Sequence, residues 1–166
     1  MILERLSDVR EGTDDLYERD FHEWSRDRAK RLHALAGDEL DWGNIASAIG
    51  TIARSERGEL RERLHVLLCA LLVWQHQPEK RAHSLQGTIG EQRTFIEGIL
   101  DMSPSLRPYA EQWLPRIWSA ARRDVAARTG LPSNTFPIEP EFTIEQVLND
   151  EFMPGPPWSP GDLIRD

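Results

Sequence analysis

Apolar side chains recur at every third or fourth position through the middle of the chain, and this spacing limits the fold more than any other feature. The longest apolar run is LHVLLCALLVW, residues 64–74. Such spacing gathers apolar residues on one face of a helix, which is then buried against other helices. We expect one helical stripe over residues 42–76, with Gly50 and Gly58 as points where the helix could break. The stripe comprises Trp42, Ile45, Ile49, Ile52, Leu60, Leu64, Leu67, Leu71 and Trp74.

Three further segments repeat this periodicity. The first begins near Asp15, the second covers residues 83–101, and the third begins at Ser103 or Ser105 and ends at Gly130. The first segment carries Leu16, Phe21, Trp24, Leu32 and Leu35. No stretch alternates in the manner of a strand. Four periodic segments therefore predict an all-α protein with the architecture of a four-helix-type bundle.

The chain after residue 130 has a different composition. Seven of the 11 prolines fall at or after Pro132, so residues 131–166 are predicted to be an irregular, Pro-rich segment. Within this segment Thr143 and Gln146 have the spacing of a capping box, in which the two side chains satisfy backbone groups at the start of a helix. A short extra helix is therefore expected near 143–149.

A single domain is the expected organisation. A chain of 166 residues can bury about 70% of its unfolded surface around one core. We expect the domain to span residues 1–166, with the helical core at about 14–130. The Pro-rich segment is expected to be extended, and Phe152 or Trp158 would attach it to the core.

Charge and hydropathy argue against several classes of protein. The formal net charge is −8, and the arginines of RSERGELRER alternate with glutamates, so the basic stripe needed for nucleic-acid binding is missing. The apolar run at 64–74 is about half as long as a membrane-spanning helix. The N-terminal MILERLSDVREG lacks the apolar core of a signal peptide, and the single cysteine, Cys69, has no intramolecular partner. We expect a soluble, cytoplasmic protein that uses no cofactor.

Several motifs occur in a fixed order along the chain: LYERDFHEW, ELDW, RSERGELRERLHVLLCALLVWQHQPEKR, TIGEQR, SPSLRPY, TGLPSNTFP and FTIEQVLNDEFMP. In this order and spacing they resemble the bacterial domain-of-unknown-function family numbered 29. The resemblance extends from about Leu16 to Pro154. It implies an all-helical bundle in a small bacterial protein, and it implies no established activity.

The stretch WQHQPEKRAH, residues 74–83, has two interpretations. Pro78 disfavours helical geometry at the residue before it, so a helix should end there, and the polar side chains would satisfy its last carbonyl groups. A partly charged His76 would also stabilise the negative end of the helix dipole. Alternatively, Trp74, His76 and an exposed Arg81 line a polar pocket for a ligand or a partner.

One spacing is typical of a metal ligand pair. Glu62 and His65 are three residues apart, which puts a carboxylate and an imidazole on one helix face, as in di-iron bundle proteins. Such a site needs a second Glu-x-x-His copy and further carboxylates from facing helices. The sequence has one copy, so we expect no metal site, and Glu62 and His65 are the candidates if one exists.

Two charged residues fall in the gap of the apolar stripe. Glu56 and Arg57 either belong to a solvated face held by ion pairs one helical turn apart, or form a buried polar network with Gln92 and Arg93. The choice between these two arrangements is left to the structure.

The sequence contains no motif of nucleophilic or phosphate chemistry, such as G-x-S-x-G or a glycine-rich phosphate loop. We therefore predict a non-catalytic cytoplasmic helical-bundle protein that acts by binding an unknown protein partner or by self-association. The alternative is a small-molecule or metal-binding enzyme that uses His65 or His76.

Overall fold

The computed structural model describes residues 14–34 and 41–164. Within these ranges every regular element is helical, apart from one isolated parallel bridge between Ala82 and Ile164. The predicted all-α class is therefore confirmed. None of the described helices combines the length and the apolar character that crossing a membrane requires.

The chain divides into two compact units. The first unit consists of Met1–Glu59 with Gly98–Arg107, and the second of Leu60–Glu97 with Pro108–Asp166. The chain length predicted one domain around one core. Each unit has its own interior, and the two interiors differ in chemistry.

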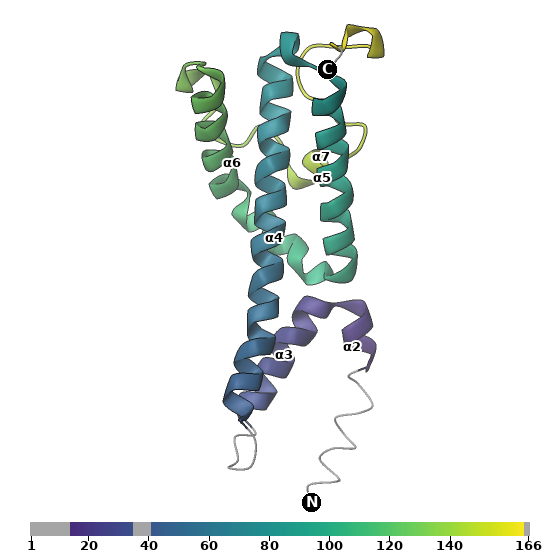
Figure 1. Cartoon of the computed structure of the whole chain (residues 1–166), viewed down its shortest axis with the longest axis vertical. Coiled ribbons are helices and arrows are strands. Elements are labelled where there is room, and N and C mark those ends of the chain that lie inside the picture. Colours follow the sequence, from purple (N-terminus) through teal and green to yellow (C-terminus); the bar gives the residue numbers. More distant parts are fainter. Residues whose placement is uncertain (1–13, 35–40, 165–166) are drawn as a thin grey trace, which may run out of the picture. The chain divides into compact units, whose positions relative to one another are not determined.

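Three long helices account for most of the described chain (Figure 1). They are α4 (Trp42–His76), α5 (His83–Met102) and α6 (Arg107–Thr129), joined by short 3₁₀ turns at Pro78–Lys80 and Pro104–Leu106. Helix α4 is continuous through both of its glycines, which settles the question of a break at Gly50 or Gly58. Helix α6 ends as predicted, because Gly130 adopts a φ of 72° that other residues rarely tolerate.

The second unit is built around the apolar face of α4. Side chains along this part of α4 are fully buried: Leu64, Leu67, Leu68, Leu71, Leu72 and Trp74 each have 0% exposure. Helix α5 adds Ile89 and Ile96, and α6 adds Trp118, to the same set of buried side chains. The C-terminal half of the predicted stripe is therefore confirmed as core.

The Pro-rich segment contains a short helix, α7 (Ile144–Leu148), that begins as the sequence predicted. Gln146 N donates to Thr143 Oγ1 at 3.3 Å, and Thr143 N donates to Gln146 Oε1 at 2.9 Å. Both halves of the capping box are present. The rest of the segment is held at its aromatic residues, since Trp158 packs edge-on against Trp74 with ring centroids 5.0 Å apart.

A buried arginine of α5 holds the end of α7. The Arg93 guanidinium is 4% exposed and donates to three backbone carbonyls, of Val147 at 2.9 Å, Asp150 at 3.2 Å and Phe152 at 2.6 Å. These carbonyls lie at and beyond the C-terminus of the helix, where no backbone donor of the helix reaches them. Arg93 therefore fixes the path of the chain after α7.

The first unit begins with two helices where the sequence predicted one. They are α2 (Asp14–Arg19) and α3 (Phe21–Ala34), and the break falls at Asp20. Asp20 Oδ1 accepts a hydrogen bond from Glu23 N at 2.8 Å, which is the geometry of an N-terminal cap. The cap starts a new helix and ends the old one. Leu35, the last apolar residue of the first periodic segment, lies outside the described residues. The same is true of the MILERLSDVREG segment.

The inward face of α3 also differs from the prediction. His22 and Ser25 are buried, at 1% and 0% exposure, whereas Phe21 and Trp24 are half-buried. The aromatic residues instead pack on one another: the Phe21 and Trp24 rings stack at 5.7 Å, and Tyr17 meets Trp24 edge-on at 4.9 Å. Polar and small side chains are left to form the interior.

The N-terminal half of α4 reverses the predicted stripe. Ile45 and Ile52 were expected in the core but are 41% and 44% exposed, whereas Ala46 and Ala53 are 1% and 3% exposed. Helices α3 and α4 approach closely, since a Cβ atom placed on Gly50 of α4 would lie 3.7 Å from the Ala29 Cβ atom of α3. Close approach favours small residues at the contact, so the alanines face inward and the isoleucines face outward.

Candidate functional site

A group of buried polar side chains lies in the interior of the first unit, and His22 is at its centre. Arg57 Nε donates to His22 Nε2 at 3.1 Å, and His22 Nδ1 lies 3.5 Å from Glu56 Oε2. The backbone N–H of His22 donates to Ser103 Oγ at 3.1 Å, and Ser103 Oγ donates to Glu56 Oε1 at 3.3 Å. Helix α3, helix α4 and the residue after α5 are thus joined through the backbone and side chain of His22 and the carboxylate of Glu56, and we call this group the His22 network.

Burial sets the protonation of this network. Removal from water lowers the pKa of His22, and the neighbouring Arg57 charge lowers it further. Burial likewise raises the pKa of Glu56, although the hydrogen bond from Ser103 opposes the shift. Because Nε2 accepts from Arg57, a neutral imidazole carries its proton on Nδ1, which faces Glu56.

Asp20 extends the network to the turn after α5. In addition to capping α3, its carboxylate accepts hydrogen bonds from the backbone N–H of Ser105 and from Ser105 Oγ, the latter at 2.9 Å. Asp20 is 9% exposed. One buried carboxylate therefore fixes both the start of α3 and the 3₁₀ turn at Pro104–Leu106.

A hollow of about 330 Å³ opens beside the His22 network, between α3 and α4. Four cationic side chains line it: Arg26, Lys30, Arg54 and Arg57. The remaining lining residues are the small ones, Ala29, Gly50 and Ala53. We call this the basic hollow. Arg57 belongs to both features, since its Nε contacts His22 while the residue lines the hollow.

Stability should fall on acidification because of His22. Its pKa is about 6.5 in the unfolded chain and lower in the folded protein, so below that pH the unfolded chain binds more protons. The stabilising contribution is therefore complete above about pH 6.5 and is lost as the pH falls. We expect His22→Gln, which retains an acceptor for Arg57 but does not titrate, to lose less free energy of unfolding between pH 7.5 and 5.5 than the wild type.

Urea unfolding at each pH measures this difference. The control is His33→Gln, since His33 is exposed on the same helix. A wild-type pH dependence that His22→Gln leaves unchanged would show that another group is responsible.

The structure assigns structural contacts to the residues predicted around WQHQPEKRAH. Trp74 is 0% exposed and Arg81 is 3% exposed, so the expectation of an exposed Arg81 is wrong. Arg81 Nε donates to Trp74 O at 3.0 Å, and Nη1 donates to Pro156 O at 3.0 Å. The guanidinium also lies over the Trp74 ring, 5.1 Å from its centroid. Arg81 thus satisfies the last turn of α4 and holds the C-terminal segment.

Gly155 is required for this arrangement. Its φ is 93°, and a Cβ atom at this position would lie 3.0 Å from Arg81 Nη2 and 3.1 Å from Gln75 Cα. The chain therefore passes Arg81 at a distance that only glycine permits.

His76 differs from the prediction in its charge. Burial lowers its pKa, with Glu141 opposing the shift, so the folded protein favours the neutral imidazole rather than the charged form expected at the helix end. The ring packs edge-on against Phe136 with centroids 5.0 Å apart. Together, Trp74, His76 and Arg81 lie among packed side chains, and their role in binding stays a prediction.

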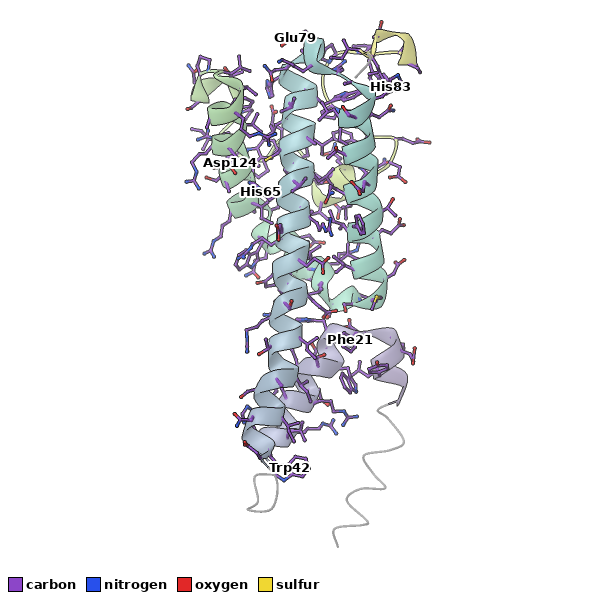
Figure 2. The ribbon with its side chains drawn as sticks, in the orientation of Figure 1. Phe21, Trp42, His65, Glu79, His83 and Asp124 are labelled. Carbon is purple, nitrogen blue, oxygen red and sulfur yellow. The ribbon has the colours of Figure 1, made fainter. Side chains whose placement is uncertain are left out.

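His65 has a different partner from the predicted one. Its Nε2 lies 3.1 Å from Asp124 Oδ2 of α6 (Figure 2). Glu62 is exposed. Across the described residues, no group of three or more His, Cys, Asp or Glu side chains is arranged to hold a metal ion.

Cys69 lies near His65 but is not arranged as a nucleophile. Its Sγ is 3.8 Å from His65 Nε2, the same nitrogen that faces Asp124, so His65 cannot relay a proton between the two. Burial raises the pKa of the Cys69 thiol to about 11, which keeps it protonated at neutral pH. Thiol catalysis therefore has no support at this position.

The second predicted polar group is divided between the units. Glu56 and Arg57 belong to the His22 network, while Arg93 binds the carbonyls that follow α7 and Gln92 is 6% exposed. Gln92 and Arg93 are buried, as the buried alternative required, whereas Glu56 and Arg57 are partly buried. A single network joining all four residues stays a prediction.

Comparison with known proteins gives a family without an assigned activity. The model of a family described as Domain of unknown function DUF29 matches residues 16–153. The chain belongs to the DUF29 family. The predicted resemblance is confirmed over nearly the range that the motifs indicated.

One solved structure has a similar fold. It is an α-helical protein of unknown function from Rhodospirillum rubrum, 22% identical, with a TM-score of 0.67 over 82% of this chain and 90% of that one. At this identity the similarity concerns the fold. A comparison with curated proteins gives no match.

The polar interior of this DUF29 chain was missed by the sequence analysis. His22 and Asp20 were not singled out, because apolar periodicity drew attention to Phe21 and Trp24 instead, and Ser103 was considered only as a possible helix start. One signal was available: Asp20 followed three residues later by Glu23 has the spacing of a capping box, which would have placed a helix start there.

Proposed function

We propose that this protein is a non-catalytic, cytoplasmic member of its family that self-associates through the N-terminal half of α4. The observation that carries the proposal is the isoleucine stripe, formed by Ile45, Ile49 and Ile52. Ile45 and Ile52 are seven residues apart, hence on one helix face, and are 41% and 44% exposed. Single exposed apolar residues are common on protein surfaces, but a row of them at heptad spacing is typical of a helix–helix contact.

The segment of α4 that carries the isoleucine stripe contains no charged residue. No Asp, Glu, Lys or Arg occurs between Asp41 and Arg54, although 29% of the chain is charged. Exposed residues beside the isoleucines are small, namely Ser47, Ala48 and Thr51. Two chains that each carry a net charge of −8 repel one another, and along residues 42–53 two copies can meet without opposing carboxylates.

A second copy of the chain fits this surface better than an unrelated partner. In a two-fold dimer the same surface is used twice, so an uncharged apolar stripe flanked by small residues is complementary to itself. Two pairs of α3 and α4 helices would form a four-helix arrangement that buries the isoleucines. The contact along residues 42–53 is about 18 Å long, so we expect a reversible dimer at micromolar concentrations or above.

Substituting one isoleucine tests the proposal. Ile52→Asp should keep the chain monomeric, because a carboxylate buried in the contact would lack a partner. The matched control is Ile138→Asp, since Ile138 is 76% exposed in the second unit. Light scattering coupled to gel filtration, over a range of loading concentrations, measures the mass of each variant.

Equal association by Ile52→Asp and the wild type would contradict the proposal. So would a full-length chain that stays monomeric while a chain lacking residues 1–13 dimerises, since that result would identify those residues as the occupant of the stripe.

A further inference from the structure

The basic hollow of the first unit concentrates positive charge in an acidic protein. The sequence has 28 acidic and 20 basic side chains, yet four cations, Arg26, Lys30, Arg54 and Arg57, line one space of about 330 Å³. They come in pairs from facing helices, four residues apart on α3 and three apart on α4. Cations that line one hollow repel one another, and an anion bound among them would lower this repulsion.

The residues that line the hollow between the cations are glycine and alanine. Gly50 faces Ala29 across the helix contact, and Ala53 lies one turn further along α4. Larger residues at these positions would fill the space between the cations. A volume of about 330 Å³ lies at the lower end of the range for small-molecule sites.

Neighbouring groups fix the direction of the guanidinium groups. Arg54 Nη2 donates to Thr51 Oγ1 at 2.8 Å, and Arg57 Nε donates to His22 Nε2 at 3.1 Å. Arg26 pairs with Glu23 at 3.0 Å, so part of its charge is already matched. His22 is 1% exposed and its Nε2 accepts the Arg57 hydrogen bond, so it acts as a positioning residue for Arg57.

We propose that the basic hollow is a binding site for a small phosphate dianion, either inorganic phosphate or the phosphate group of a small metabolite. Guanidinium groups bind phosphate oxygens through paired N–H donors, and a lysine adds a point charge. A nucleic acid is a poorer fit, because its backbone requires an extended basic surface that a chain with a net charge of −8 lacks. The site is independent of the proposed dimer, since the isoleucine stripe lies on another face of α4.

Titration calorimetry of the full chain with inorganic phosphate at low ionic strength tests this site. We expect saturable binding by the wild type, weakened about tenfold or more in Arg54→Gln and in Lys30→Gln, since each removes a charged donor. The matched control is Arg31→Gln on the same helix, where Arg31 is 50% exposed and pairs with Asp27 at 2.7 Å. This variant removes the same charge outside the hollow and should change affinity by less than about twofold.

A second variant removes the space and keeps the charges. Gly50→Leu would place its side chain towards Ala29 and Arg54, and it should abolish binding while the helix is retained, because leucine favours helix more than glycine does. Circular dichroism confirms that each variant is folded. The proposal is overturned if the wild type gives no saturable binding, if Arg31→Gln weakens binding as much as Arg54→Gln, or if folded Gly50→Leu binds as the wild type does.

Discussion

Replacing Arg93 by alanine should lower the free energy of unfolding by about 3 to 5 kcal/mol. The Arg93 guanidinium is almost fully buried and donates to the carbonyls of Val147, Asp150 and Phe152. Its removal leaves these carbonyls without a donor in a place that water reaches poorly, and it also empties the volume of the side chain. The chain after α7 would lose its main attachment to α5.

Urea unfolding followed by circular dichroism measures this loss. Arg123→Ala serves as the control, because Arg123 is exposed on α6 and its loss should cost less than about 0.5 kcal/mol. Arg93→Lys should recover part of the stability, since one ammonium group can still reach some of the carbonyls. A change below about 1 kcal/mol for Arg93→Ala would show that the carbonyls find other donors.

Leu71→Ala should cost about 2 to 5 kcal/mol, the usual range for emptying a leucine site in a core. Leu71 is 0% exposed and lies within the row of buried leucines on α4. The neighbouring side chains of Leu67, Leu68 and Leu72 are also 0% exposed, so the cavity cannot close by a small shift.

The control for Leu71→Ala is Val66→Ala on the same helix. Val66 is 37% exposed, so its substitution removes fewer buried contacts and should cost under about 1 kcal/mol. Similar losses for the two variants in urea unfolding would contradict the assignment of the buried face of α4.

Apolar periodicity predicted the core of the second unit correctly, because that core is formed by large apolar residues at helical spacing. Leu64, Leu67 and Leu71 are large, apolar and evenly spaced, and each is buried. Polar residues and prolines then marked the helix ends, so the boundaries of α4, α5 and α6 lie within a few residues of the predicted ones.

The same rule failed in the first unit for a physical reason. A helix can bury its small face when the neighbouring helix comes close, and Ala46 and Ala53 do so while Ile45 and Ile52 stay outside. Spacing identifies residues that share a face but not which face is covered. That choice depends on the partner helix, whose inward residues, His22 and Ser25, are not apolar.

The candidate sites show the same limit. The sequence placed Arg81 and Trp74 in one group, and they are in contact, but their contacts are those of a packed helix end. The basic hollow is lined by residues of α3 and α4 that are far apart in the sequence, and the packing of the two helices brings them together. No local motif records that pairing, so the hollow could be found only in three dimensions.

Self-association through the isoleucine stripe is the central claim, and sedimentation equilibrium of the full chain tests it most directly. The monomer mass is 19.1 kDa. We predict that the weight-average mass of the wild type rises towards twice this value with concentration, while a variant with both Ile45→Asp and Ile52→Asp remains at the monomer mass. A wild type that stays at 19.1 kDa up to the highest soluble concentration, or a double variant that dimerises equally well, would contradict the claim.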